Sequence, residues 1–284
     1  MVGLAAAVVS ASRKFVGPLS AAALLAVSCL GSSASAQAPH PAQSAAAAAT
    51  PVAAAVAPKT PSKFLEPKYL TLGKTVKGRD INAVVYGTGA KRVLVFGGIH
   101  GDEPHTTVIA RALAVNMNRD TLPPDLTVVI VPDVNPDGLM AATRVNANGV
   151  DINRNFPSKT WRSDYTEQKR YPGTQPSSEP ETRAVLSLLE RYPPHLVVTL
   201  HAALGCMNWD GPAGGPFAQV MASVNGYPLC ESLGYETPGS LGILVGIDKQ
   251  VPTVTIELRA KNPSDLVQEN LPALLALLKH FAAK

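Results

Sequence analysis

Five short runs of aliphatic and β-branched residues alternate with segments of helical spacing along most of the chain. The runs cover residues 81–87, 92–98, 126–132, 196–202 and 252–258, and each has the length of one buried strand. Helical periodicity is expected over residues 105–118, 178–192 and 217–226, and from a cap at Asn262 or Ser264 to the C-terminus. Apolar strands separated by helices predict an α/β fold with a central mixed, largely parallel sheet and helices on both faces.

The first 36 residues have the composition of a cleaved secretory signal peptide. They contain Arg13 and Lys14, a short apolar run and the small-residue ending Ala-Ser-Ala at 34–36. Glycine, proline and serine interrupt the apolar run, so it does not predict a membrane span. Cys29 is a second, weaker candidate feature, since its surroundings loosely resemble a lipid-attachment site.

The chain after the signal peptide divides into a linker and one domain. Residues 37–62 are rich in Ala and Pro and predict a disordered linker, while residues 63–284 are enough for one well-buried domain. Removal of Arg13 and Lys14 lowers the formal charge from +4 to +2, which does not favour nucleic acid or a membrane surface as partner. Cys206 and Cys230 form either a disulfide or two free thiols, because an exported chain permits both.

Side chains that bind metals stand at the ends of two predicted strands. His100 and Glu103 follow the strand 92–98, and His201 lies near the end of the strand 196–202. Ligands of such sheets bind beyond the carboxyl ends of the strands. A catalytic zinc takes three His or carboxylate ligands and leaves one position for water. Each residue alone is more often a loop residue or a core histidine, but together they predict a metal site.

Glu257 and Asp151 are candidates for two further roles. Glu257 is an acid within an otherwise apolar strand, where an unpaired carboxylate is costly, and it is placed to act as a general base. Its alternative is an ion pair with Arg259 or Lys261, of which Arg259 shares its face of the strand two positions on. Asp151 is a candidate to accept the second ring proton of His100 and so fix that ring.

Five motifs occur in an order that resembles the zinc metallocarboxypeptidase family. They are HGDE (100–103), NPDG (135–138), GVDINRNFP (149–157), TLHA (199–202) and TIEL (255–258), and the resemblance covers residues 75–260. His-x-x-Glu is unspecific by itself, whereas GVDINRNF and the ordered set are specific. The segments RVNANG (144–149) and GYETPGSLG (234–242) are similar to those of the compact bacterial branch, murein peptide amidase A.

The resemblance implies the chemistry of the metal site. In the family, the residues that match His100, Glu103 and His201 hold one zinc ion. Glu257 matches the family's general base, which activates the zinc-bound water and then protonates the leaving group. On this basis we expect one zinc ion and a hydrolytic reaction.

The resemblance also implies how the substrate is held. Asn153 and Arg154 match the pair that binds the terminal carboxylate, for which arginine offers bidentate hydrogen bonds. Arg144 is the candidate for the arginine that polarises the scissile carbonyl. Tyr235, 22 residues before Glu257, matches a mobile substrate-binding tyrosine, with a surface aromatic as its alternative.

The function that the resemblance implies is an exported, periplasmic peptidase or amidase. Its substrates would be peptidoglycan-derived peptides, cleaved between γ-D-Glu and meso-diaminopimelate. The alternatives are a carboxypeptidase of ordinary peptides, an N-deacylase of the aspartoacylase or succinylglutamate desuccinylase type, and a binding protein without catalysis. No feature of the sequence indicates an oligomeric state.

One segment departs from the compact relatives, and the role of a second has two alternatives. LGILVGIDK (241–249) stands where those relatives often carry a tryptophan, which bears on specificity. Residues 158–181 are charged and aromatic, and Trp161 and Tyr165 either line the cleft or belong to a plain surface loop.

Overall fold

The structure, a computed structural model, describes residues 65–284. The predicted signal peptide (1–36), linker (37–62) and lipid-attachment candidate Cys29 lie outside the described residues. Within residues 65–284, no helix has both the length and the hydropathy of a membrane span.

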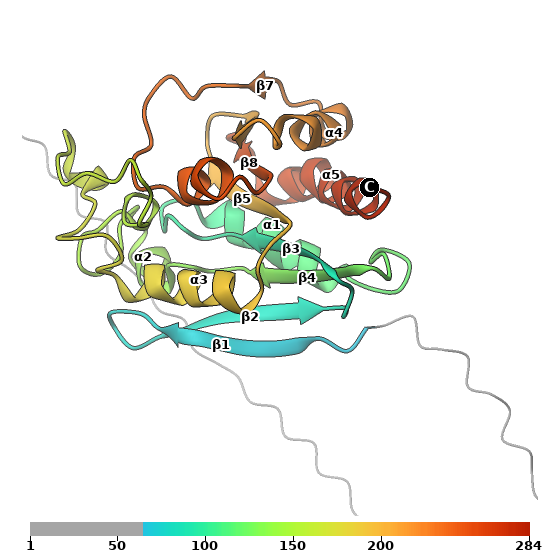
Figure 1. The fold of residues 1–284 in the computed structure, drawn as a ribbon, viewed down its shortest axis with the longest axis horizontal. Helices are drawn as coiled ribbons and strands as arrows, with labels where there is room; N and C mark the ends of the chain where they lie inside the picture. The colour runs from blue at the N-terminus through green and yellow to red at the C-terminus, as the bar shows by residue number, and fades with distance from the viewer. Residues whose placement is uncertain (1–64) are drawn as a thin grey trace, which may run out of the picture. The chain divides into compact units, whose positions relative to one another are not determined.

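Eight strands form one mixed sheet (Figure 1), in the order β1-β2-β4-β3-β5-β8-β6-β7. They are β1 (Lys68–Lys74), β2 (Asp80–Tyr86), β3 (Lys91–Phe96), β4 (Leu126–Val131), β5 (Leu196–Ala202), β6 (Cys206–Asp210), β7 (Leu229–Cys230) and β8 (Thr253–Leu258). The four central strands β4, β3, β5 and β8 are parallel, and β2 and β6 pair antiparallel to their two ends. The predicted mixed, largely parallel sheet is confirmed.

The helices are α1 (Pro104–Val115), α2 (Pro136–Ala141), α3 (Pro180–Arg191), α4 (Gly215–Asn225) and α5 (Pro263–Ala282). Proline stands in the first turn of each, where its missing N–H costs nothing. Asn262, one of the two predicted caps, accepts a hydrogen bond from the Asp265 N–H at the start of α5.

Two hydrophobic cores cover the two faces of the sheet. On one face, Val93 and Val95 of β3 pack with residues of α1, α4 and α5. On the other face, Leu94 and Phe96 of the same strand pack with α3. Successive side chains of a strand point to opposite faces, so a continuous apolar run such as Val93–Phe96 serves both cores. Helices on both faces are therefore confirmed.

Several elements were not predicted from the sequence. The edge strand β1 has mostly exposed or half-buried side chains, and β6, with the sequence CMNWD, is only five residues long and mixes apolar with polar residues. The short helix α2 and the six-residue π-helical segment Ile243–Asp248 were also missed. The strand predicted at 81–87 exists as β2, but it runs antiparallel to its neighbours. These elements depend on their neighbours for burial or pairing, which local periodicity does not encode.

The register of β5 and β8 places two candidate residues side by side. His201 of β5 pairs with Glu257 of β8, and Cys206 of β6 pairs with Glu257 on the other side. Cys206 and Cys230 are free thiols in the structure, and burial raises the pKa of Cys206 to about 12. Of the two states that the sequence left open, a disulfide and two free thiols, the structure has free thiols.

Candidate metal centre and active site

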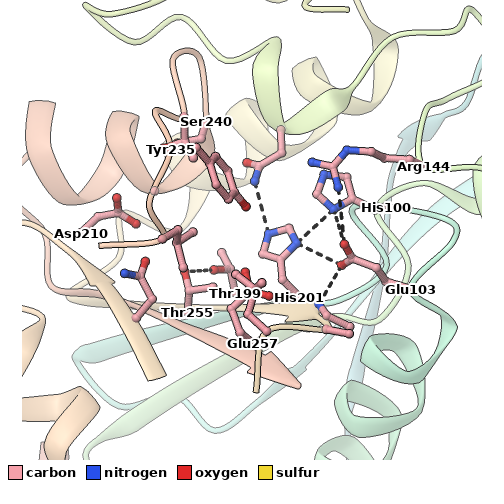
Figure 2. A pocket seen from close by; sticks show the side chains of 18 of the residues that line it. His100, Glu103, Arg144, Thr199, His201, Asp210, Tyr235, Ser240, Thr255 and Glu257 are labelled. Atoms are coloured by element: carbon pink, nitrogen blue, oxygen red, sulfur yellow. Dashed lines mark hydrogen bonds and ion pairs between the residues drawn. The ribbon is translucent and has the colours of Figure 1, made fainter. Parts of the chain in front are cut away.

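The three predicted metal ligands lie together at the carboxyl edge of the sheet (Figure 2). His100 is on the turn after β3, Glu103 caps α1 and His201 lies in β5. Each offers one ligand atom, and these atoms lie within 4.8 Å of one another. His100 Nδ1 is 2.8 Å from Glu103 Oε1, and His201 Nδ1 is 3.1 Å from Glu103 Oε2. The fold thus brings a close pair and a distant third residue to one point.

The donor set fits a metal ion. The three side chains are almost fully buried, and the two Nδ1 atoms lie 3.1 Å apart. Both nitrogens can donate to Glu103 only if each carries a proton, which places two N–H dipoles against each other. A cation instead receives lone pairs from both nitrogens and the carboxylate, which are preferred zinc donors. His100, Glu103 and His201 could therefore hold a metal ion.

A carboxylate and an arginine surround the metal cluster. Asp151, fully buried, places Oδ1 3.2 Å from His100 Nε2 and accepts a hydrogen bond of 3.0 Å from Arg144 Nε. Arg144 also reaches Glu103 Oε1 at 3.6 Å. Burial disfavours a charged imidazole, but Glu103 and Asp151 outweigh it and raise the pKa of His100 to about 9. The cluster is thus a connected network of opposite charges.

The tight turn Ile152–Arg154 presents two predicted substrate ligands to the same cavity. Asn153 Nδ2 lies 3.3 Å from His201 Nε2, and its Oδ1 accepts a hydrogen bond from the Leu241 N–H. Arg154 is 5% exposed and donates to the Asn153 carbonyl, and burial lowers its pKa. Among the described residues no carboxylate forms an ion pair with Arg154, so an anionic ligand would complete it.

Glu257 faces the cavity beside His201. It is 5% exposed, and burial raises its pKa. The alternative ion pair with Arg259 is wrong. The Arg259 guanidinium stacks over the Tyr227 ring at 4.2 Å and donates to the Gly226 carbonyl, because the strand β8 ends at Leu258 and the chain turns away.

Tyr235 lines the same cavity from the segment between β7 and residue 243 (Figure 2). Burial, followed by the nearby Glu257 carboxylate, raises the pKa of Tyr235. Tyr235 thus lines the cavity while 41% of the residue is exposed, and its role in substrate binding stays a prediction.

Trp161 and Tyr165 do not line the central cavity. Trp161 packs on Gly239, where an added Cβ would lie 2.8 Å from the indole. Tyr165 stacks against Tyr171 at 5.0 Å and lines a neighbouring cavity together with Arg154.

Sequence reasoning missed Asp210, a half-buried acid at the end of β6. Its carboxylate lines the cavity and rests on Gly242, where a Cβ would come within 2.1 Å of Oδ2. Burial raises its pKa to about 6. Within residues 65–284, the opposite charge that acts on it is His201, and it forms no ion pair. The signal was absent from the sequence because β6 itself was not recognised as a strand.

Comparisons with known proteins agree with this geometry. The zinc carboxypeptidase family model matches residues 66–213. Murein peptide amidase A of Escherichia coli K12 is 34% identical over 198 residues, which cover 66% of this chain and 78% of the relative. The corresponding protein of Vibrio campbellii is 31% identical over 200 residues, with the same coverage.

Solved structures show the same fold. The murein-tripeptide amidase of Escherichia coli O157 superposes with a TM-score of 0.62 at 30% identity, covering 76% of this chain and 93% of that one. Thrombin-activatable fibrinolysis inhibitor superposes with a TM-score of 0.67 at 20% identity, covering 78% and 70%, which shows the fold alone. The resemblance read from the five motifs is confirmed: the chain belongs to the zinc carboxypeptidase family and is a hydrolase.

Proposed function

We propose that this hydrolase cleaves the bond between γ-D-Glu and meso-diaminopimelate in peptidoglycan-derived peptides, with one zinc ion as cofactor. The observation that carries the proposal is the distribution of unpaired charge around one cavity. Arg154 and Asp210 both line it and neither has an ion-pair partner among the described residues. Diaminopimelate that is acylated on one amine carries carboxylates and a free ammonium. Similarity to murein peptide amidases supports the same substrate.

Zinc held by His100, Glu103 and His201 would supply a Lewis acid for water and for the scissile carbonyl. Glu257 takes a proton from the attacking water while the water oxygen forms a bond to the γ-carbonyl carbon of D-Glu. Glu257 then passes that proton to the amine nitrogen of diaminopimelate as the C–N bond breaks. Its raised pKa suits both steps, because a base near the working pH accepts and returns a proton readily.

The remaining roles follow the positions of the side chains. Arg154 binds the carboxylate next to the scissile amide, and the amide of Asn153, whose Nδ2 lies 3.3 Å from His201 Nε2, binds the same carboxylate. Arg144 polarises the scissile carbonyl from the metal side. Tyr235 closes the opposite side of the cavity. Asp151 keeps the His100 ring oriented.

Asp210 distinguishes diaminopimelate from a short or neutral side chain. We assign to it the free ammonium at the far end of the diaminopimelate side chain. A second cavity adjoins the first at Asn208, Asp210 and Tyr235 and continues past Thr160 and Trp209. A long side chain that ends in polar groups would fit such a continuation.

Export is part of the same proposal. A signal peptide over residues 1–36, with a linker over 37–62 and the catalytic domain over 63–284, would place the enzyme in the periplasm, where wall peptides are found. Lipid attachment at Cys29 remains the alternative to a cleaved signal.

The experiment is hydrolysis of L-Ala-γ-D-Glu-meso-diaminopimelate by the purified chain, with and without a zinc chelator. Glu257→Gln is measured beside Glu190→Gln, a control at an exposed position on α3. The proposal expects release of diaminopimelate that the chelator and Glu257→Gln abolish and the control leaves unchanged.

Other outcomes assign other functions. A zinc-loaded chain that leaves this tripeptide intact but hydrolyses N-acyl-amino acids is an N-deacylase, and one that trims ordinary peptides is a general carboxypeptidase. Zinc and peptide binding without turnover of any of them indicates a binding protein.

A further inference from the structure

The segment that carries Tyr235 has few contacts of its own. Tyr235 lies in the irregular stretch between β7 and Leu241, and within the described residues its hydroxyl makes no side-chain hydrogen bond. The end of the stretch is fixed, because the Gly239 carbonyl accepts from the Phe156 N–H and Ser158 Oγ accepts from the Gly239 N–H. The direction of the phenol therefore depends on what touches its ring.

The contact on the ring comes from Arg170. Its guanidinium carbon lies 4.6 Å from the centroid of the Tyr235 ring, which is within the range of a cation–π interaction. A planar guanidinium stacks on an aromatic face in a way that an ammonium does not. The stack orders the ring without using the phenolic hydroxyl, which stays available to the cavity.

Arg170 itself is fixed to the metal side of the site. It ends the short turn Gln168–Arg170, and the next residue, Tyr171, accepts a hydrogen bond of 2.8 Å from the Asp151 N–H. Its own ion pair is long, with Nε 3.8 Å from Glu167 Oε1, so the guanidinium is not held elsewhere. Arg170 thus links Asp151, which lies beside the metal cluster, to the ring of Tyr235.

A second link between the two segments is weaker. Arg162 forms an ion pair with Glu236 at 2.9 Å, but both side chains are more than half exposed. Exposed pairs of this kind add little to stability. Arg170 is therefore the contact that can set the ring position.

We propose that Arg170 is a positioning residue, which acts on the substrate through Tyr235 and not by direct contact. The segment 158–181 then supports the wall of the cavity. This role differs from both sequence-based alternatives, which were lining the cleft and a plain surface loop. The inference rests on the role of Tyr235 in the proposed function, and its test has one arm that needs no substrate.

The first arm is a double-mutant cycle on kcat/KM for the tripeptide, with Arg170→Met, Tyr235→Ala and the double variant. Arg170→Met keeps an unbranched apolar stem and removes the charged guanidinium. We expect it to lower kcat/KM by about threefold to tenfold, mostly through KM, as the loss of one cation–π contact implies. In the Tyr235→Ala background it should change kcat/KM less than 1.5-fold, a threshold set on the order of the scatter expected for independent sites.

Lys169→Met is the matched control, since Lys169 is the neighbouring cation on the same turn and, within residues 65–284, forms its ion pair with Glu167 at the surface. It should leave kcat/KM unchanged. An equal loss from Arg170→Met in both backgrounds would mean that Arg170 acts without Tyr235, and no loss in either would mean that it does not act. Both outcomes overturn the proposal.

The second arm follows the ring itself by fluorine NMR of the full chain labelled with 3-fluorotyrosine. The signal of Tyr235 among the 7 tyrosines is identified by its disappearance in Tyr235→Phe. We expect Arg170→Met to shift that signal and Lys169→Met to leave it in place, with thermal unfolding confirming that each variant is folded. An unshifted signal rejects the proposal even if the tripeptide is not the substrate, and inactivity of the unmutated chain rejects the substrate alone.

Discussion

Two sides of the same cavity differ in how their charges are paired. On one side, Glu103 and Asp151 each contact a histidine and Arg144, so every charge has a partner. On the other side, the buried Glu257 and the half-buried Asp210 form no ion pair within residues 65–284, and burial raises the pKa of both. Figure 2 shows the contacts gathered around His201 and Glu103, with Asp210 across the cavity.

This difference in charge pairing suits the two sides of the cavity to different roles. The paired side is held in one geometry before any ligand arrives, which suits residues that bind a metal. The unpaired side carries an energetic cost in the free protein that a bound proton or a cationic ligand removes. With the roles proposed above, the orienting groups of this site are paired, whereas its reacting and recognising acids are not.

Glu257→Gln is the substitution that we expect to distinguish the two sides of the cavity most strongly. We expect kcat to fall by about 10²- to 10⁴-fold, the usual contribution of a general base. The zinc content, measured by metal analysis, should stay the same because Glu257 is not among the three metal ligands. Loss of zinc from this variant would contradict the division of the cavity.

Asp210→Asn should change substrate choice and not the chemical step. We expect kcat/KM for the diaminopimelate tripeptide to fall by about 10- to 100-fold, the range for losing a hydrogen bond to a charged group. The analogue with 2-aminopimelate in place of diaminopimelate keeps the distal carboxylate, lacks only the ammonium and serves as the comparison. An equal fall for both substrates would show that Asp210 does not recognise the side chain.

On the paired side, Asp151→Asn should weaken zinc binding by about 10- to 100-fold, as expected when the group that orients a metal ligand loses its charge. Asn keeps the oxygen that accepts from the Asn153 N–H, so the turn is preserved. The measurement is competition with a coloured chelator. Asp133→Asn, whose carboxylate contacts Thr107 and Arg111 instead, is the control and should bind zinc normally.

The smallest expected effect is on stability. Burial raises the pKa of Asp210 from 3.8 to about 6, so the unfolded chain loses this proton at a lower pH than the folded protein. The resulting penalty develops as the pH rises from 3.8 to 6 and is complete above that range. Asp210→Asn should therefore raise the free energy of unfolding at pH 7.5 by on the order of 2 kcal/mol, and by less at pH 5.

Urea denaturation of both proteins at the two pH values measures this difference. A variant that is equally or less stable at pH 7.5 would mean that Asp210 is compensated in the free protein.

The central strands were readable from sequence, and the edges were not. β3 and β4 contain the continuous apolar runs 93–96 and 128–131, and burial on both faces selects such runs. β1 shifts its register between Thr71 and Gly73, and β6 buries Asn208 only because β8 and β7 flank it. Strands of this kind are decided by pairing with neighbours.

The candidate site divides in the same way. His100, Glu103, His201 and Glu257 stand at or next to the ends of predicted strands, so the strand pattern together with the motifs was enough to group them. Asp210 and Arg170 belong to no motif and to no predicted element, and only the folded chain brings them to the cavity and to the Tyr235 ring.

The sequence by itself determined the alternation of strands and helices, the family and the residues that could hold a metal, because these follow from local periodicity and from motifs of fixed spacing. The tertiary structure decided that Arg259 turns away from Glu257, that the half-buried Asp210 lines the cavity of the metal cluster, and that Arg170 stacks on Tyr235. Each of these depends on contacts between segments far apart in the chain. Burial and pairing of charges are set by such contacts, and no local pattern of residues specifies them.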